Sequence, residues 1–159
     1  MTSFTSMRQR VLAVLGAVSM YRLALSSLAI LAGIALILSL FGLVGPSPLE
    51  LVVSFVVLAV VISAVDAAAQ RLLHLPWRVE SSLVTALILL FVMRPGVDGP
   101  ALIGLALAGA IASISKYLIA WRGRHIFNPA AFGAAVVSIA GAFGAFEWLG
   151  TSASWWVGT

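Results

Sequence analysis

Five apolar stretches, separated by short polar or turn-forming segments, occupy most of the sequence. They span residues 23–44, 49–65, 81–93, 100–121 and 129–149. A helix needs about 20 apolar residues to cross a hydrocarbon core that is about 30 Å thick. Four of the stretches are close to that length, and the third is shorter. The pattern therefore predicts an all-α integral membrane protein with about five transmembrane segments and a short or broken third helix.

The third stretch ends at Arg94-Pro95-Gly96 and is only about 20 Å long as a helix. The first turn of a helix that begins inside the bilayer has free backbone N–H groups and a positive dipole end, which suit an anionic or carbonyl ligand. Ser81, Ser82 and Thr85 lie at this end of the segment. A short tilted helix whose Ser and Thr hydroxyls bond to the backbone explains the same residues, so both interpretations stay open.

Composition supports a membrane location. Hydrophobic residues make up 62% of the chain and charged residues only 9%, whereas a soluble domain has about 25% charged residues. The net charge of +4 does not indicate a nucleic-acid partner, because the basic residues occur singly at segment ends. The absence of cysteine excludes disulfides and Cys-ligated metal clusters within this chain. We also expect no metal site at His125, because no carboxylate cluster accompanies it.

The basic residues predict how the chain is oriented. Seven would lie on the cytoplasmic side if the N-terminus is inside, and one, Arg94, on the other side. The seven are Arg8, Arg10, Arg22, Arg71, Arg78, Arg122 and Arg124. The positive-inside rule then places the N-terminus in the cytoplasm and Thr159 outside the inner (plasma) membrane.

The chain ends predict two further parts beside the membrane domain of residues 23–149. Residues 1–22 combine arginines with a short apolar run, which favours an interfacial helix over a signal peptide. Residues 150–159 form a Trp-rich extracytoplasmic tail typical of an interfacial aromatic belt.

Three ionisable residues lie inside or at the ends of the apolar segments. Lys116 is near the end of the fourth segment, where snorkelling to the interface is favoured over a buried position facing an anionic ligand. Asp66 and Glu147 are candidate ion or proton ligands, with an interfacial position as the commoner explanation.

Asn128 and Pro129 are typical of a helix N-cap and first turn. Glycines in the last two segments, among them Gly109 and Gly133, predict close helix packing.

Three short motifs resemble a family of membrane flavin proteins. They are residues 81–89 (SSLVTALIL), the pair Ser115-Lys116 and residues 125–133 (HIFNPAAFG). They occur in the same order as in the NqrB/RnfD family, whose members are membrane components of the sodium-pumping NADH:quinone oxidoreductase and of the Rnf electron-transport complex. The resemblance covers about residues 80–135 well and the surrounding segments loosely.

The resemblance implies one half of a ten-helix fold, in which two inverted five-helix halves form an architecture like that of urea channels. It implies a flavin cofactor: FMN joined through its phosphate to a threonine, with riboflavin and quinone chemistry nearby. The residues that would line or support the flavin region are Ser81, Ser82, Thr85, Lys116, Phe127, Asn128 and Pro129. The family's threonine lies in a Ser-Gly-Ala-Thr type motif, where this chain has Val157-Gly158-Thr159 without the alanine.

Two functions follow as hypotheses. The first is a membrane electron-transport subunit, part of a redox-driven ion-translocating oxidoreductase and without catalytic residues of its own. It would work with other membrane subunits, with the missing second half of the fold, and with a quinone or a protein electron carrier. The second is a small-solute or ion channel or transporter of the same architecture without a redox cofactor. A helical assembly protein without its own site is a third, simpler alternative.

Overall fold

A computed structural model describes residues 20–75, 79–121, 124–125 and 128–142, and helices account for almost all of them. The helices are α2 (Met20–Leu40), α3 (Pro48–Leu72), α4 (Val79–Val92), α5 (Gly99–Leu118) and α6 (Pro129–Ala142). The predicted segments therefore correspond to helices, including the short third one. One small feature was not predicted: β1 (Ala120–Trp121) and β2 (Arg124–His125) pair antiparallel between α5 and α6.

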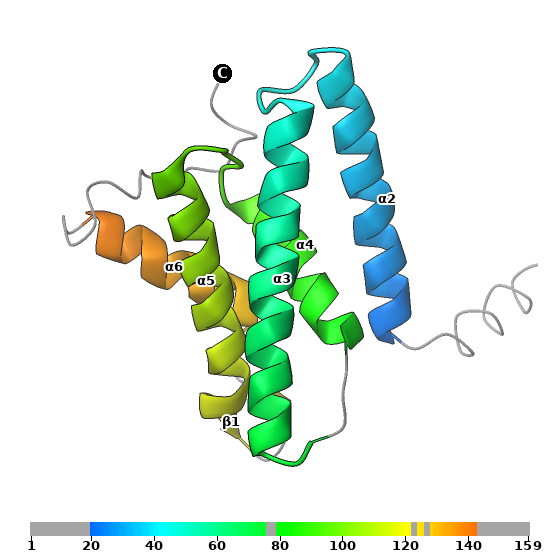
Figure 1. Cartoon of the computed structure of the whole chain (residues 1–159). Helices are drawn as coiled ribbons and strands as arrows, with labels where there is room; N and C mark the ends of the chain where they lie inside the picture. The colour runs from blue at the N-terminus through cyan, green and yellow to red at the C-terminus, as the bar shows by residue number, and fades with distance from the viewer. Residues whose placement is uncertain (1–19, 76–78, 122–123, 126–127, 143–159) are drawn as a thin grey trace, which may run out of the picture.

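Three of the helices, α2, α3 and α5, are long and apolar enough to cross a membrane. Figure 1 shows α2 and α3 running antiparallel on one side, with α4 between them and α5 on the other side of α3. α4 is also apolar but has only 14 residues, and α6 is apolar over its described residues. Three long helices, the short α4 and the described residues of α6 thus make up most of the described part of the chain.

The helix α3 is longer than the sequence predicted. It begins at Pro48 after a capping box, in which Ser47 accepts a hydrogen bond from the backbone N–H of Glu50 and the Glu50 side chain accepts one from the backbone N–H of Ser47. The expected end at residue 65 is wrong, because the helix continues to Leu72. Three consecutive alanines follow Asp66, and alanine is the best helix former. The extension brings Asp66 and Gln70, one turn apart, onto the buried face.

Both ends of α4 lie within the length of α3. Near its start, the Ser82 hydroxyl donates a hydrogen bond to Asp66, and just beyond its end Gly96 bonds to Ser54. Ser54 and Asp66 are each six residues from an end of α3, which is about 9 Å at 1.5 Å per residue. The short helix therefore begins and ends well inside the depth that α3 spans, as the sequence predicted for a broken segment.

The backbone after α4 is irregular at this depth, and Ser54 satisfies it. The buried Ser54 hydroxyl accepts a hydrogen bond from the Gly96 N–H at 3.0 Å and donates one to the Gly96 carbonyl at 3.2 Å. Backbone that is not helical is tolerated inside a bilayer only where protein or water supplies partners. One hydroxyl of α3 supplies both partners to Gly96.

Small residues bring α5 and α6 together. A side-chain Cβ at Gly133 would lie 2.8 Å from Cβ of Ala112 and would also contact the carbonyl oxygen of Ala108. Because these positions are near the middle of α5, the first turns of α6 cross α5 partway along its length. On an adjacent face of α5, a Cβ at Gly109 would meet Ile62 of α3. The predicted close packing at Gly109 and Gly133 is confirmed.

Apolar side chains cover the outside of the described helices, and several polar side chains are buried inside. Large exposed apolar residues occur along α2 and α3, such as Ile30, Ile37 and Val60. The apolar core lies between α3, α4, α5 and α6 and includes Leu58, Ile62, Leu89, Leu105, Ala112 and Ala130. Beside it, a cluster of buried polar groups lies where α3, α4 and α5 meet.

Candidate functional site

The buried polar cluster is centred on the carboxylate of Asp66, which is 2% exposed. Its Oδ2 accepts a hydrogen bond from the Ser82 hydroxyl at 2.5 Å and lies 2.8 Å from Nζ of Lys116. Its Oδ1 accepts hydrogen bonds from the hydroxyls of Ser113 and, at 3.3 Å, of Tyr117. Four donors therefore surround one carboxylate, which compensates for much of the hydration that it loses on burial.

Lys116 does not snorkel to an interface, and that expectation is wrong. The residue is 6% exposed and forms a buried salt bridge with Asp66. The expectation that Asp66 lies in an interfacial position is also wrong, because it is enclosed by the three helices. The physical reason is the same for both residues: each supplies the counter-charge that makes burial of the other tolerable. The partners are 50 positions apart in the sequence, so neither segment alone indicates the pair.

Because of the helical repeat, the polar residues that α3 and α5 contribute to the cluster lie on one face of each helix. Asp66 and Gln70 are one turn apart on α3, and Ser113, Lys116 and Tyr117 have the spacing of one face of α5. Gln70 donates a hydrogen bond to the Tyr117 hydroxyl at 3.2 Å, which fixes that ring at the edge of the cluster. The first turn of α4 adds Ser82. The members of the Asp66 cluster are Asp66, Gln70, Ser82, Ser113, Lys116 and Tyr117.

The cluster holds one negative and one positive charge, so it is neutral as a whole. Buried charges in a low-dielectric surrounding interact strongly, and removing either one leaves the other uncompensated. A group that binds or releases a cation at this point would therefore change the balance of charge between three helices. This is the chemical capacity of the site: to hold, exchange or move one positive charge at a fixed carboxylate.

Of the residues that the sequence singled out, Ser82 and Lys116 meet at Asp66. Ser81 and Thr85 do not join them. The Thr85 hydroxyl donates to the carbonyl oxygen of Ser81 at 2.9 Å within α4. This contact matches the structural interpretation that was left open for the Ser and Thr residues of the short helix, whereas Ser82 bonds to another helix.

Asn128 and Pro129 lie at the start of α6, where they act as the N-cap and the first helical residue. The Asn128 side-chain oxygen accepts a hydrogen bond from the Ala130 N–H at 3.0 Å, as predicted for a cap. Phe127, Thr159, Glu147 and the ends at residues 1–19 and 150–159 lie outside the described residues, so the expectations for them stay predictions.

Sequence reasoning missed Gln70, Ser113 and Tyr117. The helical spacing of polar residues was a signal for all three. Gln70 lies four residues after Asp66, and Ser113 lies three residues before Lys116. Tyr117 lies four residues after Ser113 on the same face of the helix. Reading polar positions at this spacing around an intramembrane charge would have found all three. Their partners on the other helices could not be read from one segment.

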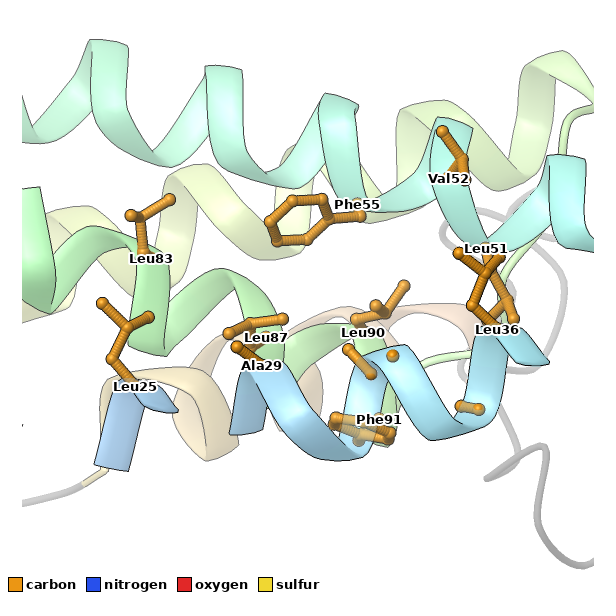
Figure 2. Close-up of a pocket in the computed structure, with 13 residues that line it drawn as sticks. Leu25, Ala29, Leu36, Leu51, Val52, Phe55, Leu83, Leu87, Leu90 and Phe91 are labelled. Carbon is orange, nitrogen blue, oxygen red and sulfur yellow. The ribbon is translucent and has the colours of Figure 1, made fainter. Parts of the chain in front are cut away.

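An apolar pocket of about 450 Å³ lies apart from the Asp66 cluster, between α2, α3 and α4. Figure 2 shows Phe55 of α3 facing Leu83 and Leu87 of α4, with Leu25, Ala29 and Leu36 of α2 opposite. Apolar side chains line it throughout, so it lacks the polar groups that fix the orientation of most cofactors. The flavin candidates Ser82 and Lys116 are not among its lining residues.

Comparisons of the chain with protein-family models, with curated proteins and with solved structures found no match.

Proposed function

We propose that this chain is a membrane-embedded subunit of an ion-coupled electron-transport complex, in which the Asp66 cluster is the charged site between the helices. The observation that carries the ion-coupled part of this proposal is the buried Asp66–Lys116 pair, with four donors from two neighbouring helices gathered on one carboxylate. Ionisable groups inside a membrane segment are costly and are typical of ion and proton pathways.

The distribution of side chains supports the membrane part of the proposal. In a soluble protein, a large contiguous apolar surface is rare, and ionisable groups are rarely buried. Here apolar side chains are exposed along the long helices, while Asp66 and Lys116 are inside. Lipid is the solvent in which this arrangement is stable. We therefore propose that the chain lies in the inner (plasma) membrane, with its N-terminus in the cytoplasm.

The short helix α4 supports the ion-coupled part. In transporters, helices that begin inside the membrane present their N-terminal dipole ends near substrate and ion sites. α4 begins inside the length of α3, and its first turn contributes Ser82 to the Asp66 cluster. A short helix and an ion pair therefore meet at one place.

The electron-transport part rests on the motif resemblance. It implies FMN, with a covalent threonine link or a riboflavin as further possibilities, and a quinone or protein carrier as partner. The flavin would carry the redox chemistry while the protein supplies position and electrostatics. Because Ser82, Lys116, Thr85 and Asn128 already bond within the chain, we propose that flavin binding needs additional protein beside these helices, either a second half of the fold or another membrane protein of the complex.

The test compares two preparations: the chain purified from its native membrane together with its partners, and the isolated 159-residue chain. We expect a flavin absorption spectrum in the native preparation and little or none in the isolated chain. A mass increase that fits FMN would identify a covalent link, and peptide mapping would then locate it. A colourless native preparation of unmodified mass would contradict the electron-transport function.

A transporter without a redox cofactor is the second candidate, and the placement of α4 inside the length of α3 favours it equally. Flux into proteoliposomes separates the two functions. Uptake of a solute or an ion by the colourless isolated chain supports the transporter. Flavin in the native preparation, with no flux through the chain alone, supports the redox function.

A further inference from the structure

The apolar pocket between α2, α3 and α4 is continuous with the exposed apolar surface of the chain. Three of its lining residues are exposed: Ala29 and Gly33 of α2 and Val52 of α3. Beside them on the same two helices, Ile30 and Val56 are exposed as well. The pocket therefore opens sideways onto the surface that faces lipid in the proposed membrane location, so an apolar molecule can enter it directly from the bilayer.

The pocket is elongated along α2. Figure 2 shows Leu25 and Leu83 at one end and Leu36 and Leu51 at the other. Leu25 and Leu36 are 11 positions apart, which is about 16 Å along a helix, or about half of the hydrocarbon core. The volume is about 450 Å³, and every lining residue is apolar. Such a space accommodates an apolar chain that lies along the helices, as lipid chains do.

A charged pair lies one helical turn beyond the end of the pocket at Leu25. Arg22 precedes Leu25 on α2 by three positions, and Glu80 precedes Leu83 on α4 by three positions. This spacing makes each charged residue the neighbour of a pocket residue on its helix face. Nε of Arg22 donates a hydrogen bond to Oε1 of Glu80 at 2.9 Å, and the two side chains are 70% and 42% exposed. One positive and one negative group are therefore accessible where the apolar pocket ends.

From the pocket and the charged pair together, we infer that this face binds a phospholipid with a zwitterionic headgroup of phosphate and ammonium, as in phosphatidylethanolamine. One acyl chain lies in the pocket, and the headgroup lies at Arg22 and Glu80. A guanidinium donates to phosphate oxygens, and a carboxylate accepts hydrogen bonds from an ammonium group. The inference rests on the proposed membrane location and does not depend on flavin or on the Asp66 cluster.

Charge complementarity decides the class of headgroup. The pair of Arg22 and Glu80 is neutral as a whole, and it offers one partner to each charge of a zwitterion. An anionic headgroup without an ammonium group would meet the guanidinium but would also face the Glu80 carboxylate, which repels it. A purely apolar occupant, such as a hydrophobic helix, would use the pocket but not the charged pair.

The experiment uses the full chain, purified in a mild detergent and freed of bound lipid. It is incubated with mixed micelles that contain equal amounts of phosphatidylethanolamine and phosphatidylglycerol with the same acyl chains. Native mass spectrometry then identifies and counts the lipids that each chain retains. We expect one phosphatidylethanolamine per chain, retained several-fold more often than phosphatidylglycerol. Equal retention of the two lipids, or retention of neither, would overturn the inference.

Two variants test the pocket. Gly33→Trp places a large ring in it, because a Cβ at Gly33 meets nothing within 4 Å, and it should lose the retained lipid. Ile37→Trp is the matched control on the same helix, at an exposed position that does not line the pocket, so retention should persist. If Gly33→Trp retains the lipid as well as Ile37→Trp does, the pocket is not the site and the inference fails.

A third variant tests the charged pair. Glu80→Gln leaves the positive charge of Arg22 without its carboxylate, so the preference should reverse in favour of phosphatidylglycerol. An unchanged preference would overturn the assignment of the headgroup. The comparison of the two lipids on the unmodified chain decides the inference even if a variant does not fold. A chain that sediments with membranes but retains no lipid refutes the lipid site alone, whereas a chain that does not sediment with membranes refutes the proposed location itself.

Discussion

At the scale of single residues, two helix ends share one hydrogen-bonding motif but have different residues at its strained position. After α2, Gly42 has φ +67°, and after α3, His74 has φ 53°. In both cases the N–H of this residue donates a hydrogen bond to the carbonyl oxygen three residues earlier. The N–H of the following residue donates to the carbonyl oxygen five residues earlier. This is the Schellman motif, which favours glycine because other residues are strained at positive φ.

His74→Gly should therefore stabilise the end of α3. Relief of left-handed strain is worth about 1 kcal/mol, and His74 is exposed, so little packing is lost. Thermal or denaturant unfolding of the purified chain measures the change. The matched variant Gly42→Ala places a side chain at the same motif position after α2, and it should destabilise by a similar amount. If His74→Gly and Gly42→Ala changed the free energy of unfolding in the same direction and by the same amount, the strain argument would be contradicted.

Single residues differ in how far the sequence alone predicts their position. The cap at Asn128 was predictable, because asparagine before proline satisfies a helix N-terminus with local contacts alone. Lys116 was not, because its position depends on Asp66, which lies on another helix. Without that counter-charge, the long side chain would reach for water. The cap was predicted from contacts within one turn, whereas the polar contact between two helices was not.

At the scale of elements, α4 depends on polar contacts at both ends. Ser54→Ala tests the end at Gly96, because it removes the hydroxyl that bonds both the N–H and the carbonyl of this buried residue. Leaving buried polar groups unpaired costs about 1–3 kcal/mol. We expect a loss of stability in this range in unfolding experiments. Ser26→Ala is the control, since its exposed hydroxyl bonds to the Leu23 carbonyl of its own helix. A Ser54 variant as stable as the Ser26 variant would show that water or another group can pair with Gly96.

The contact between α5 and α6 depends on the missing side chain of Gly133. Gly133→Ala would place a Cβ against Ala108 and Ala112, and the helices would have to separate. Overpacking of this kind costs about 1–3 kcal/mol. Gly33→Ala is the matched control in α2, where a Cβ meets nothing within 4 Å and alanine favours the helix. Thermal unfolding of both variants should show opposite signs. A neutral Gly133→Ala would mean that α6 is not held against α5 as described.

The positions of these elements were largely predictable, and their boundaries less so. Continuous apolar runs with prolines and glycines between them indicated where the helices lie, including the short α4. The end of α3 was misplaced because a charged residue was taken to mark the membrane surface. Asp66 instead continues the helix and is buried by its partners. At this position, burial among hydrogen-bonding partners lets the apolar helix continue past a charged residue.

At the scale of the whole molecule, the described helices expose many large apolar side chains, unlike the surface of a soluble domain. Composition alone predicted this, because too few charged residues were present to cover a surface facing water. What composition could not give is the arrangement that brings α3, α4 and α5 to one carboxylate. The flavin expectation rests on sequence motifs, and two of their residues, Ser82 and Lys116, meet in the Asp66 cluster. This meeting does not test the flavin expectation, which stays a prediction.

The orientation of the molecule can be tested directly because the chain has no cysteine. Single cysteines are introduced at two exposed positions, Gly45→Cys between α2 and α3 and Leu73→Cys after α3. The seven-to-one distribution of arginines predicts that Gly45 lies on the extracytoplasmic side and Leu73 on the cytoplasmic side. A membrane-impermeant thiol reagent added to intact cells should therefore label Gly45→Cys strongly.

With the same reagent, Leu73→Cys should react only after the membrane is permeabilised. The unmodified chain, which cannot react, sets the background for both variants. The reverse labelling pattern would show that the chain has the opposite orientation, with the seven arginines on the extracytoplasmic side. Labelling of both variants in intact cells would show that copies insert in both directions. In that case two oppositely oriented copies could form an inverted pair, which the arginine distribution otherwise argues against.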